Sequence, residues 1–280
     1  MTLREAFTLG KDLLQKVNIE EFETDAWLLL EGAAQCTRTE LFLRGNEPLT
    51  KEQELLYKEY LTKRSRRVPV QQILGVQCFC GLDFMVTPDV LCPRMDTEVL
   101  IEEALKRIKP GSSILDMCTG SGCIILTLLH FIKDCSGTAV DLSEKALNIA
   151  KKNAEKLEKE CTFIHSDLFE HIEGRYDVII SNPPYIATKE IEALEPEVRE
   201  HEPMMALDGK EDGLYFYRKI VSASVDYLNP EGWLMFEIGY DQGEALREMM
   251  KSAGYSQIQV IKDLAGLDRV VIGKLMQEER

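Results

Sequence analysis

Several features that would identify a class of protein are missing from this sequence. Although 45% of its 280 residues are hydrophobic, its N-terminus has no continuous apolar segment like that of a signal peptide or a membrane span. The eight cysteines form no C-x-x-C pair, and the four histidines do not cluster as metal ligands do. These absences predict a cytoplasmic, metal-free protein with reduced thiols and no membrane partner.

Positive charge is also scarce. The chain has 33 Lys and Arg against 48 Asp and Glu, a formal net charge of −15. Nucleic-acid binding depends on Lys and Arg that neutralise phosphates, so this balance argues against a direct nucleic-acid substrate and favours a protein or a small molecule. One basic run, residues 63–67, could contact RNA or an acidic partner, but such a run is more often a solvated helix end.

The first 67 residues have apolar side chains near helical spacing. Thr50 and Gln53 form a capping box at the start of one predicted helix. Pro69 and Gly75 end this region, and residues 79–86 are typical of a short hairpin. The sequence therefore predicts a helical domain over 1–80, a hairpin linker over 81–95 and a larger domain over 96–280.

From Ser113 onward, apolar runs bounded by turn residues alternate with helical stretches. This alternation is typical of βαβ units and predicts an α/β domain with a parallel sheet. The predicted strands are Ser113–Met117, Thr138–Asp141, Thr162–Asp167 and Tyr176–Ser181, with helices at Cys123–Ile132 and Glu144–Leu157. After a long insertion, Trp233–Ile238, Gln257–Ile261 and Arg269–Gly273 extend the sheet.

The turn after the first of these strands is rich in glycine. It comprises residues 116–122 (DMCTGSG) and opens a helix, so its backbone can approach a ligand at the carboxyl end of the strand. A dinucleotide fingerprint would have a third glycine at position 125, which is Ile125. The turn therefore favours a ligand without phosphates, such as S-adenosylmethionine. The residues predicted to hold it are Cys118, Thr119, Gly120, Ser121 and Gly122.

Acidic residues end the next two predicted strands. Asp141 lies where a carboxylate commonly accepts hydrogen bonds from ribose hydroxyls, although it could equally be a turn residue beside Ser143, a potential helix cap. Asp167 and Leu168 could flank an adenine ring, although an Asp after a strand is often only a turn former. Together with the glycine-rich turn, these strand ends predict one edge that binds the methyl donor.

The most specific motif is Asn182-Pro183-Pro184-Tyr185, directly after the fourth strand. A residue before proline is restricted to extended backbone angles, and each proline fixes its own φ, so Asn182 is expected to be held rigidly at the ligand edge. The alternative is a proline-rich loop with no role in chemistry. The strand context and the glycine-rich turn favour a functional motif.

The chemistry of a planar amide or amine explains these residue types. Its nitrogen is a poor nucleophile because the lone pair is delocalised, so a site must orient the nitrogen and let it pyramidalise. If the two N–H groups donate to the Asn182 side-chain oxygen and the Pro183 carbonyl, the lone pair points at the methyl group, and the same acceptors stabilise the developing charge. Tyr185 offers an aromatic surface or simply packs. We therefore predict an N-methyltransferase whose catalytic residues are Asn182, Pro183 and Tyr185. The predicted substrate site consists of Asn182, Pro183, Pro184 and Tyr185. Asn182 is also predicted to lie beside the methyl donor.

With these motifs, the sequence resembles the peptide chain release factor glutamine methyltransferases over nearly its whole length. Further matching segments are Pro93–Glu98, Glu202-Pro203, Ala206–Gly209, Asp212–Leu214, Glu237–Gly239 with Gln242, and Asp263-Leu264 with Gly266 and Arg269. The resemblance implies a class I, Rossmann-like S-adenosylmethionine-dependent methyltransferase fold. It also implies a small N-terminal helical domain that helps to recognise the release factor, and N5 methylation of the glutamine in a Gly-Gly-Gln loop bound by residues 182–185.

Three alternatives remain at this stage. A nucleic-acid adenine or guanine amino-methyltransferase uses the same chemistry, but it needs basic surface that the charge of −15 disfavours. A ribosomal protein glutamine methyltransferase belongs to the same chemical class, and a scaffold that binds the donor without turnover would be expected to lose the glycines or Asn182. The acidic stretch 190–211 could define a peptide partner or act as a mobile lid.

Overall fold

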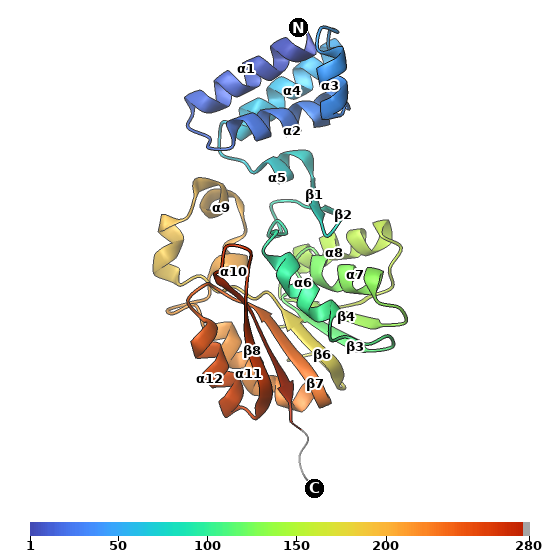
Figure 1. Cartoon of the computed structure of the whole chain (residues 1–280), viewed down its shortest axis with the longest axis vertical. Coiled ribbons are helices and arrows are strands. Elements are labelled where there is room, and N and C mark those ends of the chain that lie inside the picture. The colour runs from blue at the N-terminus through green and yellow to red at the C-terminus, as the bar shows by residue number, and fades with distance from the viewer. Residues whose placement is uncertain (277–280) are drawn as a thin grey trace. The chain divides into compact units, whose positions relative to one another are not determined.

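The computed structural model describes residues 1–276 and divides the chain into two compact units (Figure 1). We call Met1–Val76 together with Glu195–His201 the helical unit, and Gln77–Leu194 together with the residues from Glu202 onward the sheet unit. The helical unit thus ends earlier than the predicted boundary at residue 80, and it includes a segment from far along the chain. Among residues 1–276, no helix has both the length and the apolar character needed to cross a membrane.

The helical unit packs its helices around an apolar core that includes Leu14, Leu29, Leu30 and Leu61. Three of the helices begin at capping boxes, and the box predicted from Thr50 and Gln53 is confirmed. These boxes satisfy backbone N–H groups that a helix start leaves unpaired. The helices are α1 (Leu3–Lys16), α2 (Phe22–Ala34), α3 (Arg38–Arg44), α4 (Lys51–Arg64), α5 (Val70–Leu74) and the distant α9 (Pro196–His201).

The basic run at residues 63–67 is only in part a solvated helix end: Lys63 and Arg66 are exposed, whereas Arg64 is buried. Arg64 is only 6% exposed, and it binds Asp25 at 2.6 Å and Glu197 of α9 at 2.9 Å. Arg67 binds the same Glu197 oxygen at 3.2 Å. A buried guanidinium requires charged partners of this kind, so part of the run holds α9 in the helical unit.

The sheet unit contains a seven-stranded sheet in the order β5-β4-β3-β6-β7-β9-β8. Pairing is parallel from β5 to β7, whereas β9 runs antiparallel to both β7 and β8. The predicted bounds of β3 and β6 are confirmed, and the other predicted strands are present with shifted ends. The strands are β3 (Ser113–Met117), β4 (Ser136–Asp141), β5 (Thr162–His165), β6 (Tyr176–Ser181), β7 (Leu228–Glu237), β8 (Tyr255–Lys262) and β9 (Asp268–Leu275).

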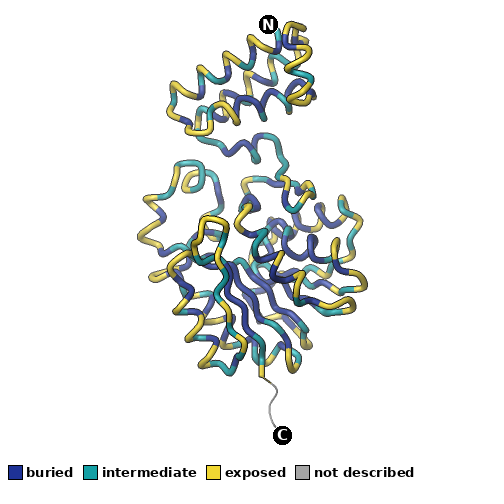
Figure 2. The backbone as a smooth tube through the Cα atoms, in the orientation of Figure 1, coloured by how far each residue is buried: buried dark blue, intermediate teal, exposed yellow. Residues whose placement is uncertain are grey.

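Helices cover both faces of this sheet, whose central strands are buried in Figure 2, whereas the edge strands β5 and β8 are partly exposed. Neighbouring strand residues belong to opposite cores: Ile114 and Ile180 pack on one face, and Leu115 and Ile179 on the other. This two-sided burial explains why the strands are nearly continuous apolar runs. The first face carries α6 (Thr97–Leu105), α7 (Cys123–Phe131) and α8 (Glu144–Lys156), and the second carries α11 (Tyr215–Tyr227) and α12 (Gly243–Ser252) (Figure 1).

The predicted hairpin linker at 81–95 starts too late in the sequence. The hairpin comprises β1 (Val76–Phe79) and β2 (Leu82–Met85) and so begins before residue 81. Gly75, at a φ of 73°, ends α5 directly before β1. Cys80 and Gly81, with φ values of 49° and 77°, already form the turn between the two strands. The acidic stretch 190–211 contains the end of the short helix η1 (Thr188–Ala193) and all of α9 and α10 (Met204–Leu207).

Candidate functional site

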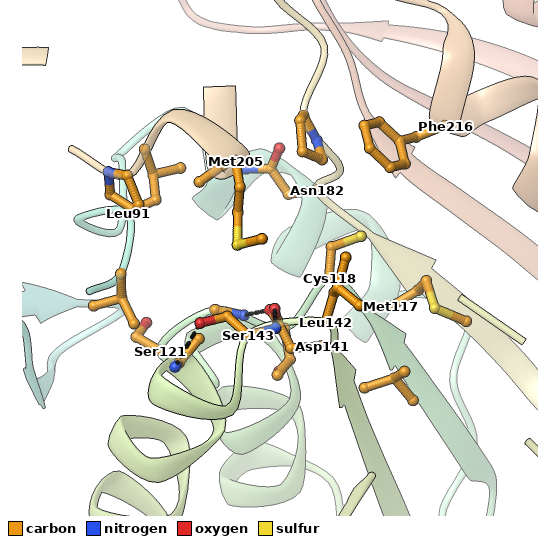
Figure 3. Close-up of a pocket in the computed structure, with 18 of the residues that line it drawn as sticks. Leu91, Met117, Cys118, Ser121, Asp141, Leu142, Ser143, Asn182, Met205 and Phe216 are labelled. Atoms are coloured by element: carbon orange, nitrogen blue, oxygen red, sulfur yellow. Dashed lines mark hydrogen bonds between the residues drawn. The ribbon is translucent and has the colours of Figure 1, made fainter. Parts of the chain in front are cut away.

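A cavity of about 320 Å³ lies at the carboxyl ends of β3, β4 and β6, within the sheet unit (Figure 3). In Figure 3, Asn182 and Met205 lie on one side of it, and Ser121 and Asp141 on the other. The structure thus brings most of the predicted site residues together. Those that line the cavity are Cys118, Thr119, Gly120, Ser121, Asp141, Asp167, Leu168, Asn182 and Pro184, whereas Gly122, Pro183 and Tyr185 are not among its lining residues.

The glycine-rich turn forms one wall through an unusual backbone. Cys118 and Gly120 have φ values of 62° and 55°, in the left-handed region that favours glycine. Gly122, at a φ of 79°, stands just before α7, and a Cβ there would lie 3.2 Å from the Ala150 Cβ atom. Gly122 therefore lets α7 and α8 pack closely, while Cys118 to Ser121 face the cavity.

Asp141 fixes this turn to the end of β4. One carboxylate oxygen accepts the Gly120 N–H at 2.9 Å, and the other accepts the Ser143 N–H at 2.8 Å. Burial raises the pKa of Asp141, although these backbone donors counteract the rise. The Ser143 hydroxyl accepts the Ala146 N–H and caps α8, as predicted. Asp141 thus supports the turn while its carboxylate remains in the cavity wall.

Asp116 of β3 holds the glycine-rich turn through Thr119. It is fully buried near the carboxyl end of β3 and accepts the Thr119 hydroxyl at 2.6 Å. Because burial disfavours its charged form, the pKa of Asp116 is raised to about 7. Sequence reasoning gave this residue no role, since an Asp in a strand has no distinctive spacing signal.

Asn182 forms the opposite wall, directly after β6. Its Nδ2 donates to the hydroxyl of Thr97, the first residue of α6, at 3.5 Å. The preceding Ser181 is held by a 2.6 Å hydrogen bond from its hydroxyl to the Met117 carbonyl. The strand-to-loop transition is therefore fixed immediately before Asn182.

Tyr185 is part of a buried network behind the cavity. Its hydroxyl donates to Glu237 Oε1 at 3.3 Å, and its carbonyl accepts from Gln242 Nε2 at 2.9 Å. Glu237 ends β7 and is only 1% exposed. Burial and the nearby Glu237 charge raise the pKa of Tyr185 well above its ordinary value. The aromatic ring that does line the cavity belongs to Phe216 of α11.

Several lining residues were missed by sequence reasoning. Phe216 and Met205 supply apolar walls, and Arg94 stands at the cavity with its guanidinium 2.7 Å from the buried Glu202 carboxylate. These residues come from segments that are distant in sequence and meet only in the fold. Arg94 and Thr97 lie in the Pro93–Glu98 segment, so the family resemblance was the only sequence signal for them.

The cavity combines the polar backbone of the glycine-rich turn with the side-chain amide of Asn182 and with apolar side chains. The Asn182 amide nitrogen is used by Thr97, which leaves the amide oxygen available as an acceptor. Met205 and Phe216 add apolar side chains to the lining of the cavity. Such a site can hold one ligand against the turn and orient an N–H group of a second one.

Comparison with known proteins covers both units. Residues 5–75 match the family model described as the PrmC N-terminal domain, and residues 88–199 match the methyltransferase small domain. A release factor glutamine methyltransferase of Geobacter sulfurreducens is 42% identical over 98% of this chain and 97% of its own length. Its counterpart from Caulobacter vibrioides is 40% identical over 98% and 96%. A methyltransferase structure from Pyrococcus furiosus shares the fold, with a TM-score of 0.56 and 19% identity over 77% of this chain and all of that one.

Proposed function

The chain belongs to the release factor glutamine methyltransferases, and on that premise we propose that its cavity is where a release factor glutamine is methylated. It is an S-adenosylmethionine-dependent enzyme that methylates the side-chain amide nitrogen, N5, of the glutamine in a Gly-Gly-Gln motif. The observation that carries the site assignment is the position of Asn182, whose amide stands across the cavity from the glycine-rich turn.

The donor half of the cavity fits S-adenosylmethionine by its chemistry. That cofactor supplies an electrophilic methyl group when bound. The left-handed turn at Cys118 to Ser121 keeps backbone groups close to the cavity, and Asp141 offers carboxylate lone pairs there. Asp167 and Leu168 follow β5 on the same edge. We assign Cys118 to Ser121, Asp141, Asp167, Leu168 and Asn182 to the donor, with Gly122 acting through the packing of α7.

The acceptor half orients the glutamine amide. With its nitrogen bound to Thr97, Asn182 presents its oxygen to one substrate N–H, and we assign the second N–H to the Pro183 carbonyl. Two such acceptors fix the plane of the amide and stabilise positive charge on its nitrogen. Pro184 limits the motion of this loop and lines the cavity, while Tyr185 braces it through Glu237.

We assign recognition of the release factor to both units. The helical unit matches the PrmC N-terminal domain, and we assign its surface to the protein substrate. An enzyme that modifies release factors works in the cytoplasm. The formal charge of −15 supports a protein substrate over a nucleic acid, because nucleic-acid affinity depends on basic groups.

The test is to incubate the protein with methyl-labelled donor and an intact release factor, and then to locate the label by mass spectrometry. We expect the label on N5 of the Gly-Gly-Gln glutamine. Label on a ribosomal protein glutamine in a parallel reaction would widen the substrate range. Label confined to nucleic acid, with none on the release factor, would overturn the proposed function.

A further inference from the structure

The cavity can receive only a small part of a protein substrate. A volume of about 320 Å³ can enclose a small ligand and a side chain, but not a folded protein. When a release factor delivers its glutamine there, the rest of that protein must lie on the surface around the cavity. The two glycines of a Gly-Gly-Gln motif carry no side chains, so further side-chain contacts must come from residues that flank the motif.

Large apolar side chains are exposed on this surface. Met95 is 78% exposed and directly follows Arg94, a lining residue of the cavity. Met204 and Met205, each about half exposed, begin α10, and Met205 lines the cavity (Figure 3). Leu264 is fully exposed in the turn between β8 and β9. Single exposed apolar residues are normal, so these matter only if they form one surface.

Charged pairs tie the three segments together. Arg94 binds Glu202 at 2.7 Å and so holds the segment that leads into α10. Asp96 and Asp263 both bind Arg269, at 3.3 and 3.1 Å. The exposed methionine between Arg94 and Asp96 is thus linked on one side to the start of α10 and on the other to the β8–β9 turn. We call the four exposed residues Met95, Met204, Met205 and Leu264 the apolar rim.

The turn that carries Leu264 is closed by its own hydrogen bonds. Asp263 Oδ1 accepts the N–H groups of Ala265 and Leu267 at 2.9 and 3.0 Å. The Asp263 N–H donates to the Leu267 carbonyl at 2.8 Å, and Gly266 has a φ of 82°. The turn therefore holds a leucine in water, where its side chain adds no burial to the fold. An apolar group fixed in this way loses little conformational freedom when a partner covers it.

We propose that the apolar rim is the surface on which apolar side chains of the release factor, next to its Gly-Gly-Gln loop, dock. The occupant follows from position, because the rim is continuous with the cavity to which the substrate glutamine is assigned. Exposed apolar patches mark protein interfaces, and methionine adapts its shape to a partner surface. The inference rests on the proposed function, since only a protein substrate extends beyond the cavity.

The test is steady-state methylation of an intact release factor at saturating donor. Leu264→Ser removes an apolar side chain that docking would bury, and we expect KM for the release factor to rise about 10-fold. The value of kcat should stay near that of wild type, because the rim contacts the substrate equally in the ground state and the transition state. Met95→Ser should act in the same way. Leu264→Met remains apolar and should keep KM near the wild-type value.

Leu105→Ser is the matched control. Leu105 is a partly exposed leucine at the opposite end of α6 from Thr97, which lines the cavity. This variant loses the same side chain away from the rim and should keep the wild-type KM. Should it not fold, Phe131→Ser replaces it, because Phe131 is an exposed residue at the end of α7. Donor affinity, measured by calorimetry, should be unchanged in all these variants.

The outcomes separate this inference from the proposed function. A wild-type protein that does not methylate a release factor contradicts the proposed function itself. An active wild type whose Leu264→Ser and Met95→Ser variants have the same KM as the control overturns the docking role alone. A loss of kcat at unchanged KM in the rim variants overturns it as well. A rise in KM confined to the rim variants supports it.

Discussion

The two halves of the cavity are built in different ways. In the donor half, the hydrogen bonds of residues 119–122 and of Asp141 join residues at most 32 positions apart, such as Asp116 with Thr119, Gly120 with Asp141 and Ser121 with Asn153. In the acceptor half, the bonds of Asn182 and Tyr185 reach 85 and 52 positions along the chain, to Thr97 and Glu237. Donor binding is therefore supported by one compact stretch of strands and turns. Substrate orientation depends on contacts that exist only in the complete fold.

The largest effect that this comparison predicts is on turnover. Asn182→Ala removes the acceptor for the substrate amide, and the rate at saturating donor should fall on the order of 10²-fold or more. Asn182→Asp keeps an oxygen but adds a negative charge and loses the NH₂ group that binds Thr97, so it should retain partial activity. Single-turnover kinetics measure both. An Asp variant slower than the Ala variant would show that the oxygen acceptor is not the essential feature.

Asp141→Ala should act on the opposite half. It removes the acceptor of the Gly120 and Ser143 N–H groups and the carboxylate in the cavity wall. Hydrogen bonds to a charged group contribute about 1.5–3 kcal/mol, so donor affinity should fall about 10-fold or more in calorimetry. Asp226→Ala, an exposed change on α11, is the control. Equal donor affinity in the two variants would remove Asp141 from the donor site.

A smaller effect is expected where the acceptor loop is fixed from behind. Gln242 accepts the Gly239 N–H and donates to the Tyr185 carbonyl, both at 2.9 Å. Gln242→Glu keeps the acceptor but loses the donor, and leaving the Tyr185 carbonyl unpaired should cost about 1–3 kcal/mol. We expect a lower thermal unfolding midpoint and a raised KM for the release factor. Midpoint and KM both equal to wild type would rule out this bracing role.

The smallest effect on the cavity should come from the helical unit. Glu197→Gln removes the charge that holds Arg64 and Arg67, although Arg64 keeps Asp25 as a partner. The free energy of unfolding should fall by about 1–3 kcal/mol, while donor affinity stays unchanged. Glu200→Gln, in an exposed pair with Arg199, should change stability by less than about 1 kcal/mol. Denaturant titration checks both, and equal stabilities would contradict the importance of the buried cluster.

The same contrast explains what the sequence could predict. Strands β3 and β6, the turn at Cys118 to Ser121 and the motif at Asn182 were predictable, because periodicity, glycine and proline act over a few neighbouring residues. The roles of Glu237 and Phe216 were not, since each depends on which distant segments the fold brings together. The place of α9 in the helical unit was missed for the same reason: the Glu197 contacts to Arg64 and Arg67 join residues about 130 positions apart.

The most direct test of the account measures both halves in one experiment. Donor affinity and the single-turnover rate at saturating donor are determined for wild type, Asp141→Ala and Asn182→Ala with the same release factor. We predict that Asp141→Ala weakens donor binding but recovers much of its rate at saturation, whereas Asn182→Ala keeps most of its donor affinity and remains slow. An Asn182→Ala variant as fast as wild type would contradict the account, because Asn182 would then have no part in orienting the glutamine amide.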